Sequence, residues 1–166
     1  MIALRILKQK SLMSKLLTSV LFDAFLLEEA VIDTYNTFTI DGHIHKDFYK
    51  DIASDTEEIP SEDFSSWEKI RPIALELIKG KQTPLGIKVV LHASKEMKEM
   101  ILSKADSRLL QDQIVLALRI SLSQGSLIIT TGMSSSVFSL DISIEKAWDE
   151  FIPSFLESNG IETELL

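Results

Sequence analysis

The apolar pattern at the start of the chain recurs 85 positions later, and this echo constrains the fold more than any other feature of the sequence. Alternating apolar residues over 2–7 predict a strand, and the same spacing over 87–92 predicts a second one. At the same offset, the apolar positions of a helix expected over 12–21 fall on those of a helix expected over 95–105. The sequence therefore predicts two successive units of strand, helix and β-hairpin. Chance remains an alternative, because in any α+β chain strands precede helices.

Each helix is expected to lead into a hairpin. Residues 29–40 are β-branched and aromatic, as strands prefer, and Asp41-Gly42 supplies the residues of a two-residue turn, with a return strand over about 43–49. The hairpin glycines Gly42 and Gly125 correspond at an offset of 83. The second unit is expected to end in a meander with strands over about 113–122, 126–132 and 135–140, and a turn at Gln124-Gly125.

Two further helices lie outside these units. A helix over about 66–79 is expected to begin after Ser65 or Ser66, and the last helix, over about 144–158, to begin after Ser143. Between the hairpin and the first of these helices, the acidic residues 51–64 predict an exposed loop.

The expected fold class is α+β, in one domain spanning residues 1–166. Its parts are a first βα-hairpin unit over 1–50, an acidic loop and inserted helix over 51–85, a second βα-meander unit over 86–141, and a C-terminal helix and tail over 142–166. A pseudo-twofold relation would set helices 12–21 and 95–105 side by side beneath one continuous sheet.

Composition places this domain among globular proteins. Hydrophobic residues make up 45% of the chain, yet no run approaches the ~18 apolar residues that cross a membrane. Lys15 interrupts the apolar run near the N-terminus, which predicts a folded amphipathic helix in place of a signal peptide. There is no cysteine, so the expected location is the cytoplasm by default.

The net charge of −8 argues against a general nucleic-acid binder, because contacts to phosphates supply most of that affinity. The charge is nevertheless uneven, since residues 1–21 carry four basic residues and no acid. Residues 94–108 are also slightly basic. Ordinary solvated helix faces would explain the same distribution.

The order strand, helix, hairpin over residues 1–49 and 86–140 resembles one domain of the sliding DNA clamps, at the level of topology and apolar pattern. In those rings, paired βαβββ modules place two helices along the hole, facing duplex DNA. The resemblance implies four DNA-facing candidates on the corresponding helices: Lys10, Lys15, Lys95 and Lys98. The inserted helix, the acidic loop and the C-terminal helix depart from the clamp pattern, and fold analogy does not carry function with it.

A closer likeness exists at the level of sequence. The stretches TFTIDGHIHKDFY (37–49), RPIALELIKGKQTP (71–84) and AWDEF (147–151) resemble an uncharacterised bacterial domain family. The likeness covers most of the chain, but it implies no activity, because none is established for that family.

The pair His43 and His45 is the main candidate for chemistry. On a strand, residues two apart project from one face, and imidazole with a nearby carboxylate suits zinc, nickel or iron. A catalytic site needs about three protein ligands, and His92 is the only other imidazole. The alternative is two histidines on a solvated strand face. The chain contains no P-loop, dinucleotide fingerprint or HExxH motif.

These observations favour a non-enzymatic binding or scaffold protein, with a clamp-like, DNA-associated form as one version. The expected partners are another protein, a second copy of the chain or duplex DNA, with no membrane and no cofactor. A metal-dependent enzyme using His43 and His45 and a plain oligomerising protein remain the alternatives.

Overall fold

The computed structural model describes residues 1–50, 59–80 and 82–166 and confirms an α+β fold. The strands are β1 (Ala3–Ile6), β2 (Leu26–Asp33), β3 (Thr37–Asp41), β4 (Gly86–His92), β5 (Ile114–Ser123), β6 (Ser126–Ser135) and β7 (Thr163–Leu165). The helices are α1 (Gln9–Thr18), α2 (Asp47–Lys50), α3 (Trp67–Ile78), α4 (Lys95–Lys104) and α5 (Ser143–Ser158), with a 3-10 turn over Gln111–Gln113.

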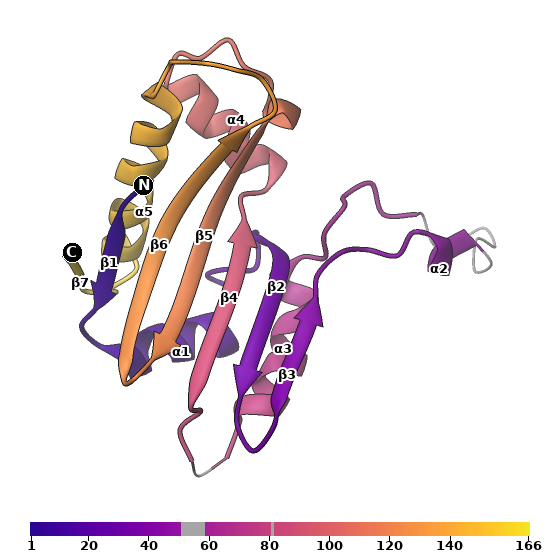
Figure 1. Ribbon diagram of the computed structural model, residues 1–166, viewed down its shortest axis with the longest axis vertical. Coiled ribbons are helices and arrows are strands. Elements are labelled where there is room, and N and C mark those ends of the chain that lie inside the picture. The colour runs from indigo at the N-terminus through magenta and orange to yellow at the C-terminus, as the bar shows by residue number, and fades with distance from the viewer. Residues whose placement is uncertain (51–58, 81) are drawn as a thin grey trace.

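All seven strands form one antiparallel sheet in the order β3-β2-β4-β5-β6-β1-β7 (Figure 1). Strand, helix and hairpin do follow one another twice along the chain, as β1, α1, β2, β3 and as β4, α4, β5, β6. The expected pseudo-twofold relation, however, is wrong. In the first unit, β1 pairs with β6, so the strands β4, β5 and β6 lie between β1 and its hairpin of β2 and β3. In the second unit, β4 lies directly beside β5 of its own hairpin.

The helices of the two units are likewise not side by side. Helix α1 packs on α3 and helix α4 packs on α5, and α1 and α4 lie near opposite ends of the sheet (Figure 1). Helix α1 also begins at Gln9, three residues before the expected start at residue 12, with Lys8 at the N-cap. The burial of Leu12 and Leu16 against the sheet fixes the position of this helix.

The first hairpin turns earlier than expected. Its turn spans residues 34–36, where the Thr34 N–H donates to the Asn36 carbonyl at 3.0 Å, and the Thr37 hydroxyl donates to Asp33 at 2.6 Å. The predicted turn at Asp41-Gly42 and the predicted return strand over 43–49 are therefore wrong. That part of the chain leaves the sheet, forms the short helix α2 and returns along residues 59–66 (Figure 1).

The second hairpin forms where it was expected. The turn residues Gln124 and Gly125 have φ of 50° and 74°, as a two-residue turn of this kind requires. The predicted strand over 135–140 is wrong, because Ser135 pairs with Ile114, the first residue of β5, and no further residues of β5 lie beyond it. Residues 126–135 instead form the single strand β6.

The other helices begin close to the predicted positions. Helix α3 follows Ser66, and helix α4 follows Ser94, whose hydroxyl accepts from the Met97 N–H at 3.3 Å. Helix α5 begins at Ser143 itself, one residue before the expected start. Residues 51–58 of the predicted acidic loop lie outside the described residues. In the described part of the chain, no helix has the length and apolar character to cross a bilayer.

The core lies between the sheet and four helices. Helices α1, α3, α4 and α5 lie behind the sheet in the view of Figure 1, and the strand residues on that side are almost fully buried. Two indole N–H groups join elements of this layer. Trp67 on α3 donates to the Leu16 carbonyl of α1 at 2.8 Å, and Trp148 on α5 donates to the Ala117 carbonyl of β5 at 3.0 Å. We call this side of the sheet the covered face.

Candidate functional site

The histidines predicted as metal ligands lie where the chain leaves β3. Residues 42–44 pair with residues 63–65 of the returning segment, with Ile44 N–H donating to the Asp63 carbonyl and Ser65 N–H to the Gly42 carbonyl, both at 2.8 Å. His43 forms an isolated β-bridge with Phe64. The predicted His-x-His pair therefore does not stand on a strand of the sheet.

Gly42 makes this pairing possible. A Cβ built on Gly42 would lie 1.7 Å from the backbone carbonyl oxygen of Leu27, a contact that neither group can avoid by changing a rotamer. Glycine is therefore required by a close approach of two backbones, which is a different reason from the hairpin turn predicted from sequence.

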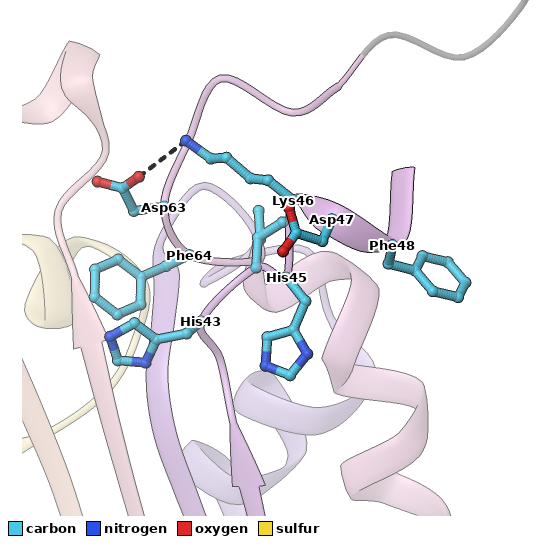
Figure 2. Close-up of a pocket in the computed structure, with 8 residues that line it drawn as sticks. His43, His45, Lys46, Asp47, Phe48, Asp63 and Phe64 are labelled. Carbon is cyan, nitrogen blue, oxygen red and sulfur yellow. Dashed lines mark hydrogen bonds and ion pairs between the residues drawn. The ribbon is translucent and has the colours of Figure 1, made fainter. Parts of the chain in front are cut away.

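The phenyl ring of Phe64 contacts two imidazoles, tilted against that of His43 and edge-on to that of His92, in what we call the His–Phe–His stack (His43, Phe64, His92). The ring centroids of His43 and Phe64 are 4.5 Å apart, and those of Phe64 and His92 are 4.9 Å apart. Figure 2 shows the His43 ring turned toward Phe64 and the His45 side chain lying apart from it. Sequence reasoning noted His92 only as a third imidazole, because nothing in the sequence brings residue 64 beside it.

Each imidazole of the stack has a carboxylate partner. His43 Nδ1 lies 2.7 Å from Asp41 Oδ1, and His92 Nε2 lies 2.5 Å from Glu28 Oε2. Glu28 sits at a β-bulge between Leu27 and Glu29 in β2, and such bulges re-aim side chains. The backbone N–H of His43 and then its ring hold the pKa of the Asp41 carboxyl below its usual value, because both stabilise the charged form.

The described residues do not complete a three-ligand metal site around His43 and His45, and the pair stays a prediction. Among the described residues, no group of three or more histidine, aspartate or glutamate side chains is placed to hold an ion. Beside the stack, residues including His92, Lys98 and Asp112 line a cleft of about 290 Å³.

The four lysines predicted to face DNA are divided between the two ends of the sheet. Lys10 and Lys15 are on α1, and Lys95 and Lys98 are on α4 (Figure 1). The Lys15 ammonium group donates to the Asn159 carbonyl, and that of Lys98 donates to the Ile114 carbonyl at 3.3 Å. The structure therefore does not bring the four together on one helical surface.

A larger feature, which the sequence reasoning missed, is the side of the sheet opposite the helices. We call it the bare face. Cross-strand pairing places its side chains in rows, because residues directly opposite one another in a register point the same way. The bare face includes Ala3, Arg5, Val31, Lys88, Val90, His92, Val115, Ala117, Arg119, Ser121, Ile128, Thr130, Gly132 and Ser134, with Glu29 and Glu164 toward its edges.

The signal for the bare face is present in the sequence of β5. Every second residue, from Ile114 to Leu122, is buried, and the residues between them are half-buried or exposed. Such alternation indicates a strand with one solvated side. The alternation in one strand does not show whether the whole sheet has one buried and one solvated face, because that depends on where every helix packs.

Most charged groups on the bare face are neutralised in pairs. Arg5 Nη1 lies 2.7 Å from Glu164 Oε2, and Lys88 Nζ lies 2.5 Å from Glu29 Oε2. His92, the last residue of β4, pairs with Glu28. On β5 and β6 the side chains of this face are small or apolar, apart from Arg119.

A model described as a family of unknown function (DUF5721) matches residues 15–164. This confirms the predicted resemblance to an uncharacterised family. Comparisons with curated proteins and with solved structures gave no match. The matched region contains β2 to β6 and the helices α3, α4 and α5, so most of both faces belongs to what the family shares.

Proposed function

As a member of the family of unknown function DUF5721, the chain brings no assigned activity, and we propose from its own geometry that it is a non-enzymatic binding protein. Its binding surface is the bare face, and the ligand is another protein. The observation that supports this is the one-sided packing of the sheet, since four helices lie on the covered face and the opposite face is open to solvent (Figure 1).

The dimensions of the bare face suit a protein partner. Seven strands at about 4.8 Å spacing and central strands of ten residues at about 3.3 Å per residue give roughly 30 Å in each direction. After allowance for the short edge strands, the area is on the order of 800 Å², which is what one partner contributes to a standard protein–protein interface.

The chemistry of the bare face also suits docking. Apolar side chains such as Val90 and Ile128 are partly accessible near its middle, and Arg5 and Lys88 are held in ion pairs. Specific interfaces likewise have few charges at their centre. A flat face of this kind offers no enclosed volume for a small substrate, whereas it offers a broad contact for a second sheet or a helix.

The proposal is tested by photo-crosslinking in the native host. A photoreactive amino acid replaces Ser121 on the bare face or, as a control, Glu99 on the exposed side of α4. We expect one discrete adduct from position 121 and none from position 99. The crosslinked protein, once identified and purified, should bind the wild type and lose at least about 10-fold in affinity for Ser121→Trp, while Glu99→Trp binds as the wild type does.

Equal binding by the two tryptophan variants would overturn the proposal, as would the absence of any adduct at position 121. The alternatives have distinct outcomes. Duplex DNA binding that weakens steeply with salt and with Lys10→Glu would favour the DNA-associated version. Near-stoichiometric zinc or iron in the purified chain, lost with His43→Ala, would favour a metal-dependent enzyme.

A further inference from the structure

The middle of the bare face holds one cation whose position differs from all the others. Strand β5 is the fourth of seven in the sheet, and Arg119 is near the midpoint of its ten residues. The side chain is exposed. Arg119 therefore stands at the geometric centre of the surface that we propose for docking.

No acidic side chain lies next to Arg119 on the sheet. Its direct cross-strand neighbours are Val90 on β4 and Thr130 on β6. The nearest carboxylate in the same row, that of Glu29, is engaged by Lys88 at 2.5 Å. Within the described ranges, the guanidinium of Arg119 has no ion-pair or hydrogen-bond partner, whereas the side chains of Arg5, Lys88 and His92 on the same face each have one.

A depression adjoins this guanidinium. Gly132 on β6 faces Ala117 on β5, one step along the face from the pair of Arg119 and Thr130. A Cβ built on Gly132 would meet only the Ala117 Cβ, at 3.8 Å, so space is open above Gly132. Residues two apart on a strand are about 6.7 Å apart, which places the depression within one side-chain length of Arg119.

We propose that the partner docks a carboxylate on Arg119 and an aromatic side chain over Ala117 and Gly132. The inference rests on the proposed function, and it assigns the chemistry of the partner. The guanidinium fork matches a carboxylate in two parallel hydrogen bonds, and arginine at the centre of an interface is a frequent anchor of binding energy. Aromatic side chains cover exposed glycine in sheets, because the ring shields the bare backbone.

The charge of Arg119 favours an acidic partner on the bare face over a second copy of the chain. Two bare faces related by a twofold axis through their centre would bring the two Arg119 guanidinium groups together, and like charges buried at an interface disfavour association. A partner with an acidic residue at the corresponding position removes that conflict. It would carry Asp or Glu and an aromatic residue two positions apart on one side of a strand.

The probe for the test is a displayed library of random 16-residue peptides, selected on the full chain. Enriched sequences are expected to carry the pair of acid and aromatic residues. Their affinity should fall at least about 10-fold for Arg119→Gln, and similarly for Thr130→Glu, which gives the guanidinium an internal carboxylate across the strand pair. The matched control is Arg108→Gln, an exposed arginine outside the strands of the sheet, which should change affinity less than about 2-fold.

Gly132→Val separates binding from folding. The added side chain fills the depression but meets ordinary contacts, so the variant should melt at or above the wild-type temperature while binding the selected peptides at least about 10-fold more weakly. A structural role for this position would instead lower the melting temperature together with binding.

Four outcomes would overturn the inference. Arg119 would not be the anchor if the selected peptides lack an acidic residue. The same would follow if they bind Arg119→Gln as tightly as the wild type. If Ser121→Trp nevertheless abolishes the binding of those peptides, the bare face remains the docking surface and only the proposed chemistry of the partner is wrong. Peptides insensitive to every bare-face substitution would overturn the proposed function as well. A stable dimer of the purified chain in native mass spectrometry, dissociated by Ser121→Trp, would replace the acidic partner with a second copy.

Discussion

The two faces of the sheet are made from alternate residues of the same strands, yet they have different compositions. In β6, Ile129 is fully buried on the covered face, and its neighbour Ile128 is partly accessible on the bare face. On β5 the covered side is entirely aliphatic, whereas the other side carries Ala117, Arg119 and Ser121. The difference indicates that packing restricts the covered face to apolar side chains, whereas the bare face can present polar and charged side chains to a partner.

The sharpest test of this difference compares the two adjacent isoleucines. Ile129→Ala removes side-chain volume from a site with no access to solvent and should lower the free energy of unfolding by about 2–5 kcal/mol. Ile128→Ala should cost about 1 kcal/mol or less, because its side chain is only partly buried. Urea denaturation of both variants measures the two costs, and equal losses would mean that something packs on the bare face in solution.

A smaller loss is expected for Trp67→Phe on the covered side. The substitution leaves the Leu16 carbonyl without its indole donor in a buried place, which should cost about 1–3 kcal/mol in the free energy of unfolding. Thermal melting followed by the fluorescence of the remaining Trp148 provides the measurement. A melting temperature equal to that of the wild type would show that the bond between α1 and α3 is not needed.

On the bare face, Gly132→Val should have the opposite sign. Valine suits a strand better than glycine, so the free energy of unfolding should rise by about 0.5–1 kcal/mol. Denaturation with urea, beside the wild type, gives the value. A loss of stability would indicate that the depression over Ala117 is part of the packing, against the contrast drawn between the two faces.

The smallest effects concern two exposed carboxylates, one at each face. Asp141 accepts the Ser143 N–H at the start of α5, which lowers its pKa, and Asp41 accepts the His43 N–H near the bare face, which lowers its pKa as well. Because each pKa is lower in the folded state, each charge stabilises the fold at neutral pH, and the contribution is lost as the pH falls through the folded pKa.

Asp141→Asn and Asp41→Asn should therefore melt slightly below the wild type at pH 7, and the differences should shrink below about pH 4. Melting curves across that range decide the sign. Differences that persist in acid would assign the effect to geometry and not to charge. Similar results at the two sites would show that local caps act alike on both sides of the sheet.

The sequence predicted the elements whose signals are local. The turn at Gln124-Gly125 follows from residues that tolerate positive φ, and the start of α4 follows from the hydroxyl of Ser94. The first hairpin was misplaced because Gly42 resembles a turn residue, whereas its actual role is to let the backbone of Leu27 approach. Nothing near residue 42 in the sequence records that contact.

The candidate site was less predictable than the elements. The pair His43 and His45 is conspicuous in the sequence, but its partner in space is Phe64, which returns after an excursion of about twenty residues. Nothing in the sequence distinguishes Arg119, because an isolated arginine in an alternating strand is ordinary. Its significance depends on being central, on lacking an acidic neighbour and on facing away from the helices.

By itself, the sequence determined the period of each strand and helix, since side-chain alternation and capping act over a few residues. It also determined that each strand has one apolar side. Only the tertiary structure decided that β1 joins the sheet beside β6, and that four helices cover the same face. The reason is physical: which apolar sides meet is settled by burial of the whole chain at once, and the face that remains exposed is a result of that competition.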